Sequence, residues 1–230
     1  MRPAAFSQVW WEEKGLTAML VLLVLAIFVA LPLETLNVVS PTVVGVVITL
    51  LLVAGIVAMS GRGSATIVVA VFAAASLVAR WITVIHPGRT IAIWDLGLAI
   101  LSLSLLTGFV LRHVFRAGPV TADRIRGSIL AYLLLGLIWC LAYQLINLLV
   151  PGAFHFPEPQ VAMPGRLSHH LVYFSYITLT TVGYGDITPV YPVARTLVAA
   201  EALVGQLYPA ILIGRLISLQ ISSRPADVDR

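Results

Sequence analysis

Residues 178–186 have the side-chain types and the order with the clearest chemical meaning in this chain. They read Thr-Leu-Thr-Thr-Val-Gly-Tyr-Gly-Asp. A cation sheds its water only where rigidly held oxygens replace the hydration shell, and backbone carbonyls can do this when successive ones point at one axis. That geometry needs positive φ at alternate residues, which glycine reaches without a Cβ penalty. The spacing of Gly183 and Gly185 therefore indicates a backbone cation site.

The same stretch resembles the selectivity filter of potassium channels, whose core Thr-Val-Gly-Tyr-Gly stands here at 181–185. The resemblance implies K+ ions bound by oxygens of Thr181, Val182, Gly183 and Tyr184. The Thr181 hydroxyl would form the innermost ligand layer, while Val182 and Tyr184 would turn their side chains away from the axis. Because one chain supplies one such strand, the resemblance also implies a homotetramer around the pore. It implies no enzyme activity and no cofactor besides K+ in the filter.

The composition excludes a soluble domain, since 60% of the residues are hydrophobic, 10% are charged and the mean hydropathy is +1.00. A helix needs about 20 apolar residues to cross a hydrocarbon core of about 30 Å, and lipid offers no partners to an open backbone. We therefore predict an all-α membrane protein with a re-entrant pore helix, a filter loop and six transmembrane helices. The predicted spans are 16–34, 41–60, 64–85, 91–113, 127–150 and 193–220.

The basic residues orient these spans. With a cytoplasmic N-terminus, the inside carries ten basic residues and the outside or its margin carries four, which fits the positive-inside rule. We thus expect a multi-pass protein of the plasma membrane with both termini cytoplasmic and the filter loop outside. The net charge of +4 then reflects topology, and no basic stripe suggests nucleic acid. The four outer residues are Arg80, Arg89, Arg166 and Arg195.

The arginine-bearing linker Arg112–Arg126 divides the chain into two predicted domains. Residues 121–230 have the order span, re-entrant loop, span, which is the pore module of K+ channels. Residues 1–120 form a four-span, sensor-like membrane domain in front of it. The resemblance includes specific sequence motifs over about 125–215. Before that, it consists only of the number and placement of the predicted spans. Residues 1–30 are interpreted as a retained span in preference to a cleaved signal peptide.

The fourth predicted span argues against strong voltage gating. A voltage sensor needs several arginines, because each charge yields about 2.3 kcal/mol per 100 mV. Residues 96–111 hold no charge at all. Arg80 and Asp95 lie near the outer ends of their spans, where an ion pair would serve structure more than voltage sensing.

A pore helix is predicted from His169 to Thr180, with Ser168 as its N-cap. Thr180, Tyr173 and Asp186 are the predicted filter supports. The Tyr173 hydroxyl either donates to Asp186, tying the loop to the pore helix, or packs between subunits.

The last span carries the predicted gate and cavity. Gly205 stands 19 residues beyond Asp186, the offset of the hinge glycine in similar channels. Pro209 removes a backbone donor one turn later, which favours a bend. Pore-facing positions recur at helical spacing, with one polar cavity residue followed by an apolar constriction: Gln206, Ile213 and Ile217. Gating at the filter itself is the rival interpretation.

Glu201 needs separate weighing, because a carboxyl group within a span is costly and functional by default. It lies about 140° around the helix from Gln206, so it is expected to face the pore helix. A structural bond to Ser175, Thr178 or backbone is the favoured interpretation, and a gating or proton-sensing role is the alternative.

The predicted function is a K+-selective channel with a tetrameric pore that is not strongly voltage-gated. The alternative is the pore-loop subunit of a K+ uptake transporter, a class that usually carries four degenerate filters in one chain. A modulatory, non-conducting subunit is a third interpretation, which an intact filter disfavours. Sensitivity to external protons is also open, since four histidines fall on the predicted outer side: His86, His155, His169 and His170.

Overall fold

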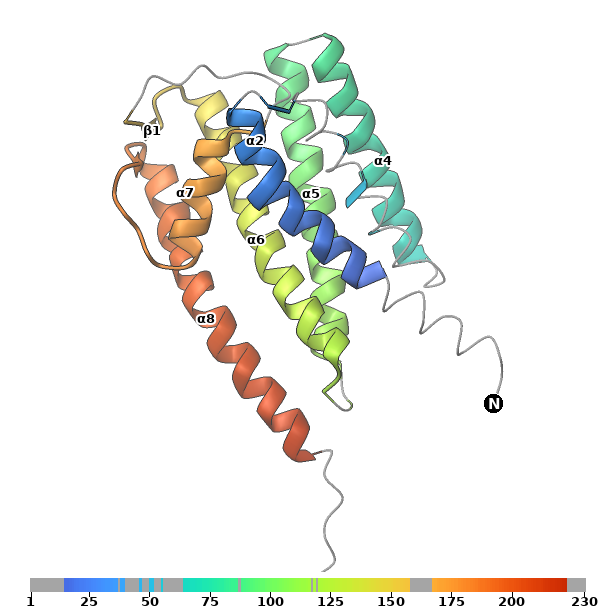
Figure 1. The fold of residues 1–230 in the computed structure, drawn as a ribbon. Coiled ribbons are helices and arrows are strands. Elements are labelled where there is room, and N and C mark those ends of the chain that lie inside the picture. Colours follow the sequence, from blue (N-terminus) through green and yellow to red (C-terminus); the bar gives the residue numbers. More distant parts are fainter. Residues whose placement is uncertain are drawn as a thin grey trace, which may run out of the picture.

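The described part of the chain is a bundle of long helices (Figure 1). A computed structural model describes residues 15–36, 64–86, 88–116, 120–157 and 167–222, with the separate positions 38, 39, 46, 50, 51, 55 and 118. Four of its helices are long and apolar enough to cross a bilayer. They are Gly15–Thr35, Arg89–Val114, Ala122–Leu149 and Pro192–Ile221.

The first of these helices, Gly15–Thr35, contains the π-helical turn η1 (Ala26–Ala30) and ends in α2 (Leu31–Thr35). The helix α4 (Ser64–Ile85) and the helix α5 (Arg89–Val114) follow and pack on each other. Residues 70–83 form a shorter apolar stretch within α4. The predicted span 41–60 lies outside the described residues except at four positions, so it stays a prediction.

The second half of the chain begins with α6 (Ala122–Leu149). The short helix α7 (His169–Leu179) and the long helix α8 (Pro192–Ser222) follow it. Two short strands, β1 (Phe154–His155) and β2 (Thr188–Pro189), pair antiparallel beside them. The span predicted at 127–150 starts five residues early, because its charged first turns find partners: Arg126 contacts Asp123 at 3.2 Å, and Arg124 donates to the Gly118 carbonyl.

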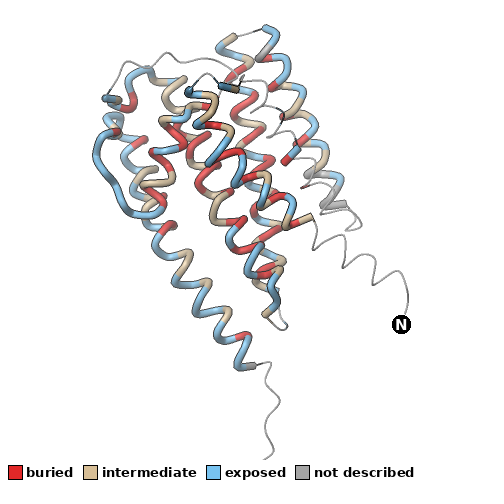
Figure 2. The backbone as a smooth tube through the Cα atoms, viewed as in Figure 1, coloured by how far each residue is buried: buried red, intermediate tan, exposed pale blue. Residues whose placement is uncertain are grey.

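The helices pack in chain order, with α4 on α5, α5 on α6, α6 on α7 and α7 on α8. Figure 1 accordingly shows α4 and α8 at opposite edges, with α8 extending beyond the rest of the bundle. Buried residues gather along the facing sides of α5, α6 and α7, whereas much of α8 is exposed (Figure 2). Of the most apolar 18-residue stretch of α8, only 11% is buried within the chain. This long apolar helix is therefore largely without a partner in one chain.

Candidate functional site

The segment after α7 has an unusual backbone. Thr181, Gly183 and Gly185 all have positive φ, at 60°, 52° and 79°. The alternation predicted from the two glycines therefore extends back to Thr181, a residue with a Cβ that visits this region at a cost. Alternate left-handed residues prevent successive carbonyls from pointing to opposite sides, as they would in an ordinary strand.

The amides of this segment turn back toward α7. The Ile177 carbonyl accepts the N–H groups of Val182 at 2.8 Å and Gly183 at 3.1 Å, and the Thr178 carbonyl accepts that of Thr181 at 2.9 Å. Within the described part of the chain, no group donates a hydrogen bond to the carbonyls of residues 181–184. The N–H groups of this segment are thus bonded to α7, whereas the carbonyl oxygens of residues 181–184 remain available to a ligand.

The side chains around the segment hold its two ends. The side chains of Tyr173 and Asp186 interact electrostatically, and packing of Tyr173 between subunits stays the alternative prediction. Thr180 caps the end of α7 and its hydroxyl donates to the Tyr176 carbonyl at 2.7 Å. The side chains of Val182 and Tyr184 are exposed in the single chain, so they do not pack within it.

The helix α7 starts at the predicted N-cap, because the Ser168 hydroxyl accepts the N–H of Leu171. It ends at Leu179, one residue earlier than predicted, and Thr180 is its C-cap. The rings of His169 and His170 lie 3.9 Å apart at its first turn. Loss of water contact, followed by the charge of His170, lowers the pKa of His169 below its usual value.

Hydroxyl groups bind α7 to α6. Tyr176 donates to the Leu133 carbonyl at 2.6 Å, and Tyr132 donates to the Leu179 carbonyl at 3.0 Å. Gly136 lets the two helices approach, because a Cβ there would lie 2.5 Å from the Tyr176 ring. These bonds fix the helix from which the positive-φ segment departs.

Glu201 of α8 is completely buried and faces α7, as predicted. Its Oε1 lies 2.5 Å from the Ser175 hydroxyl, one of the partners expected from the sequence. Its Oε2 lies 2.5 Å from the Tyr143 hydroxyl of α6, a partner that the sequence analysis missed. A buried tyrosine hydroxyl normally finds a partner, and this requirement was the available signal for Tyr143.

Gly205, the predicted hinge glycine, packs closely against the end of α7. A Cβ at this position would overlap the carbonyl group of Leu179, two residues before Thr181. Glycine is therefore required here by the contact between α8 and α7. The helix α8 continues through Pro209, and the predicted hinge and bend stay predictions.

The remaining predicted cavity and gate residues lie on α8 away from the bundle core. Gln206, Ile213 and Ile217 are exposed in the single chain, and Pro209 is half-buried. Ile213 and Ile217 keep 57% and 55% of their surface, which leaves an apolar stripe along the second half of the helix.

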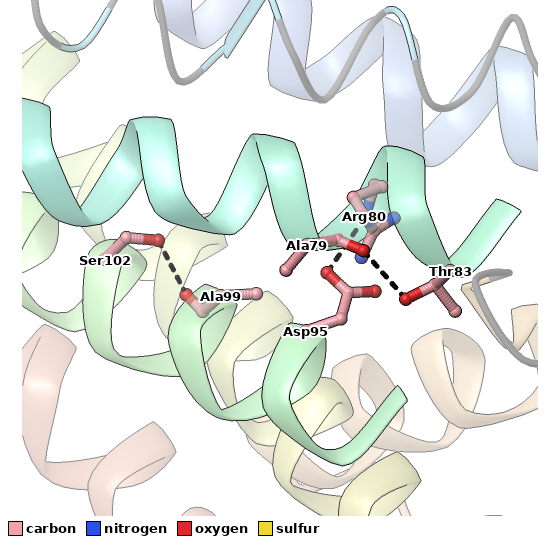
Figure 3. A network of polar contacts seen from close by, with 6 residues as sticks. All are labelled: Ala79, Arg80, Thr83, Asp95, Ala99 and Ser102. Atoms are coloured by element: carbon pink, nitrogen blue, oxygen red, sulfur yellow. Dashed lines mark hydrogen bonds and ion pairs between the residues drawn. The ribbon is translucent and has the colours of Figure 1, made fainter. Parts of the chain in front are cut away.

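In the first half of the chain, Arg80 of α4 pairs with Asp95 of α5, as the sequence suggested. Their side chains are 10% and 2% exposed, and Arg80 Nε lies 3.5 Å from Asp95 Oδ1 (Figure 3). Thr83 lies beside the pair and donates to the Ala79 carbonyl of its own helix. This buried pair joins the C-terminal end of α4 to the N-terminal end of α5.

Comparison with known proteins bears on the second half of the chain. Residues 132–220, from α6 through α8, match the family described as "Ion channel". This match supports an ion channel. The matched region contains the positive-φ segment, its supports on α7 and the exposed stripe of α8. It leaves the helices before α6 unmatched.

Two curated relatives match part of the chain. Protein LctB of Bacillus caldotenax is 38% identical over 88 residues, which cover 37% of this chain and 64% of that protein. Protein LctB of Geobacillus stearothermophilus is 37% identical over 82 residues, covering 34% of this chain and 60% of that protein. The chain thus spans less than two thirds of either relative. No solved structure matches the chain.

Proposed function

We propose that this chain is one subunit of a homotetrameric, K+-selective channel of the plasma membrane, with both termini cytoplasmic. Residues 181–185 would form one quarter of the filter, and K+ would bind to oxygens of Thr181, Val182, Gly183 and Tyr184. The carrying observation is the unused carbonyls of residues 181–184, beside alternate positive φ angles within a region that matches an ion channel. Carbonyl rings of this kind replace the hydration shell of K+.

The need for several copies follows from the same geometry. One strand presents oxygens on one side, and a dehydrated ion needs them all round. The exposed side chains of Val182 and Tyr184 and the exposed apolar face of α8 would be covered by neighbouring subunits. We infer a four-span, sensor-like domain over residues 1–120 and a pore domain over residues 121–230. The alternative function, a subunit of a K+ uptake transporter, is disfavoured by the single complete filter sequence.

The test is a comparison of two glycine variants in liposomes. Gly183→Ala and Gly152→Ala both place a Cβ at positive φ, and nothing lies within 4 Å of either Cβ. Their backbone strain is thus matched, but Gly152 lies in the turn after α6. We expect wild type and Gly152→Ala to show Ba2+-sensitive flux that favours K+ over Na+, and Gly183→Ala to lose it. Unchanged K+/Na+ discrimination in Gly183→Ala contradicts the proposal.

A further inference from the structure

A line of closely spaced oxygen atoms crosses the three helices α6, α7 and α8. The Tyr143 hydroxyl lies 2.5 Å from Glu201 Oε2, and Glu201 Oε1 lies 2.5 Å from Ser175 Oγ. Ser175 Oγ in turn lies 2.7 Å from the Gly136 carbonyl oxygen. The side chains of Tyr143, Ser175 and Glu201 are all fully buried.

The number of protons in this line decides the charge of Glu201. All three separations belong to the O–H···O range, and two oxygens that close repel unless a proton lies between them. The hydroxyls of Tyr143 and Ser175 bring one proton each, and a backbone carbonyl brings none. An ionised Glu201 would leave two protons for three contacts. A protonated Glu201 supplies the third.

We propose that Glu201 is a neutral carboxylic acid in the folded protein and acts as a hydrogen-bond donor that positions α7 on α8. Tyr143 donates to Glu201 Oε2, the acid proton on Oε1 is donated to Ser175, and the Ser175 hydroxyl donates to the Gly136 carbonyl. The bonds then run in one direction from α6 through α8 and α7 back to α6. Every oxygen in the line has a partner in this arrangement.

The surroundings of Glu201 agree with a neutral group. The titratable side chains that interact with Glu201 come from α6 and α7, and all of them are tyrosines or a cysteine. Tyrosine and cysteine have ordinary pKa values of about 10 and 8.5, so both are neutral at pH 7. Among the described residues no basic side chain interacts with Glu201, and a buried carboxylate without a cation is very costly. These neighbours are Tyr132, Cys140, Tyr143 and Tyr176.

The position of Glu201 makes this proton relevant to the proposed conduction, and that consequence rests on the proposed function. Glu201 lies one helical turn before Gly205, which contacts Leu179 at the end of α7. Removal of the proton would turn the Ser175 hydroxyl from the Gly136 carbonyl toward the carboxylate. The helix α7 would then lose a bond to α6 just before the filter.

Infrared spectroscopy of the purified full chain in lipid at neutral pH tests the charge directly. We expect a carboxylic-acid C=O stretching band in wild type that is lost in Glu201→Gln. The band should stay in Asp123→Asn, whose native carboxylate contacts Arg126, and should shift in Ser175→Ala. Glu201→Gln should fold, because its amide can donate to Ser175 and accept from Tyr143. Loss of a carboxylate band instead of the acid band in Glu201→Gln overturns the proposal.

Potassium flux against pH tests the positioning role. We expect wild type to lose flux progressively at alkaline pH and Glu201→Gln, whose amide keeps its protons, to retain it. An alkaline loss of equal size in both proteins, or in neither, overturns this role. The infrared result does not depend on conduction, so a chain that fails to conduct K+ still reports the charge of Glu201.

Discussion

Gly205 of α8 packs directly against the carbonyl group of Leu179, the last residue of α7. The contact joins the final span to the helix that leads into the proposed filter. Pro209 adds a second effect at the same place, because it has no N–H to donate to the carbonyl of Gly205 one turn before it. This part of α8 therefore packs closely on α7 and also lacks one backbone hydrogen bond of its own helix, the one to the Gly205 carbonyl.

Gly205→Ala is therefore expected to damage the pore module. Its Cβ would overlap the Leu179 carbonyl, and overpacking of this kind costs about 1–3 kcal/mol. Thermal unfolding in detergent and K+/Na+ flux ratios would measure the loss of stability and of selectivity. Gly214→Ala is the matched control in the same helix, since nothing lies within 4 Å of its Cβ. Equal stability and selectivity in the two variants would contradict the packing role.

Asp95→Asn should destabilise the first half of the chain. It leaves the Arg80 charge buried without its partner, and loss of one member of a buried pair costs about 3–5 kcal/mol. The double variant Arg80→Gln/Asp95→Asn should recover part of that loss, because no unpaired charge remains. Melting temperatures of the single and double variants provide the measurement. A double variant less stable than Asp95→Asn would count against the argument.

Conductance should depend only weakly on voltage. Residues 96–111 of α5 hold no charged side chain to move through the field. Arg112 lies in the last turn of α5 and Arg116 just beyond it, and both are exposed. Voltage ramps on wild type and on Arg112→Gln/Arg116→Gln should therefore give similar, shallow curves. A gating charge of several elementary charges would show that the interpretation of α5 is wrong.

Polar substitution on the apolar stripe should raise resting flux. Four α8 helices that converge at Ile213 and Ile217 would form a constriction that dewets, and an asparagine there would keep water in it. Ile211→Asn is the matched control, since Ile211 has similar exposure, 59% against 57% for Ile213, on a different side of the helix. A thiol reagent added from the cytoplasmic side tests this gate in the variant Gln206→Cys. Equal reaction rates in the conducting and non-conducting states would favour a gate at the filter.

Acid should destabilise the fold through His169. Its pKa is lowered in the folded state, so the unfolded chain binds the proton first as pH falls below about 6.5. Stability is then complete above this range and is lost as pH falls toward the folded pKa. His169→Gln should reduce the fall in melting temperature between neutral and acid pH. His86→Gln, at an exposed position after α4, should leave that fall unchanged.

The sequence predicted those features that depend on local order. Ser168 caps α7 and Gly183 takes positive φ because each property is set by a residue and its nearest neighbours. Ser175 was found as a partner of Glu201 because helical periodicity fixes which side a residue faces. The hydrogen bond from Tyr143 was missed, since it depends on how α6 is rotated against α8.

Gly205 illustrates the other limit. Its offset from the filter motif predicted a hinge glycine, and the structure adds a contact with the Leu179 carbonyl of another helix. An offset along the chain does not reveal which atoms approach a glycine from a distant segment. The start of α6 at Ala122 has a similar cause, because Arg126 also reaches Thr17 in the first helix.

The pairing of β1 with β2 has a consequence for biogenesis. Phe154 lies opposite Pro189, and the Ala153 carbonyl accepts the N–H groups of Val190 and Tyr191. These bonds close the loop that contains α7 and the proposed filter segment, residues 181–185, within the same chain. We therefore expect a newly synthesised monomer to shape this loop before it meets its neighbours. In the proposed tetramer, assembly would then join loops that are already folded, and subunits would exchange between tetramers without unfolding.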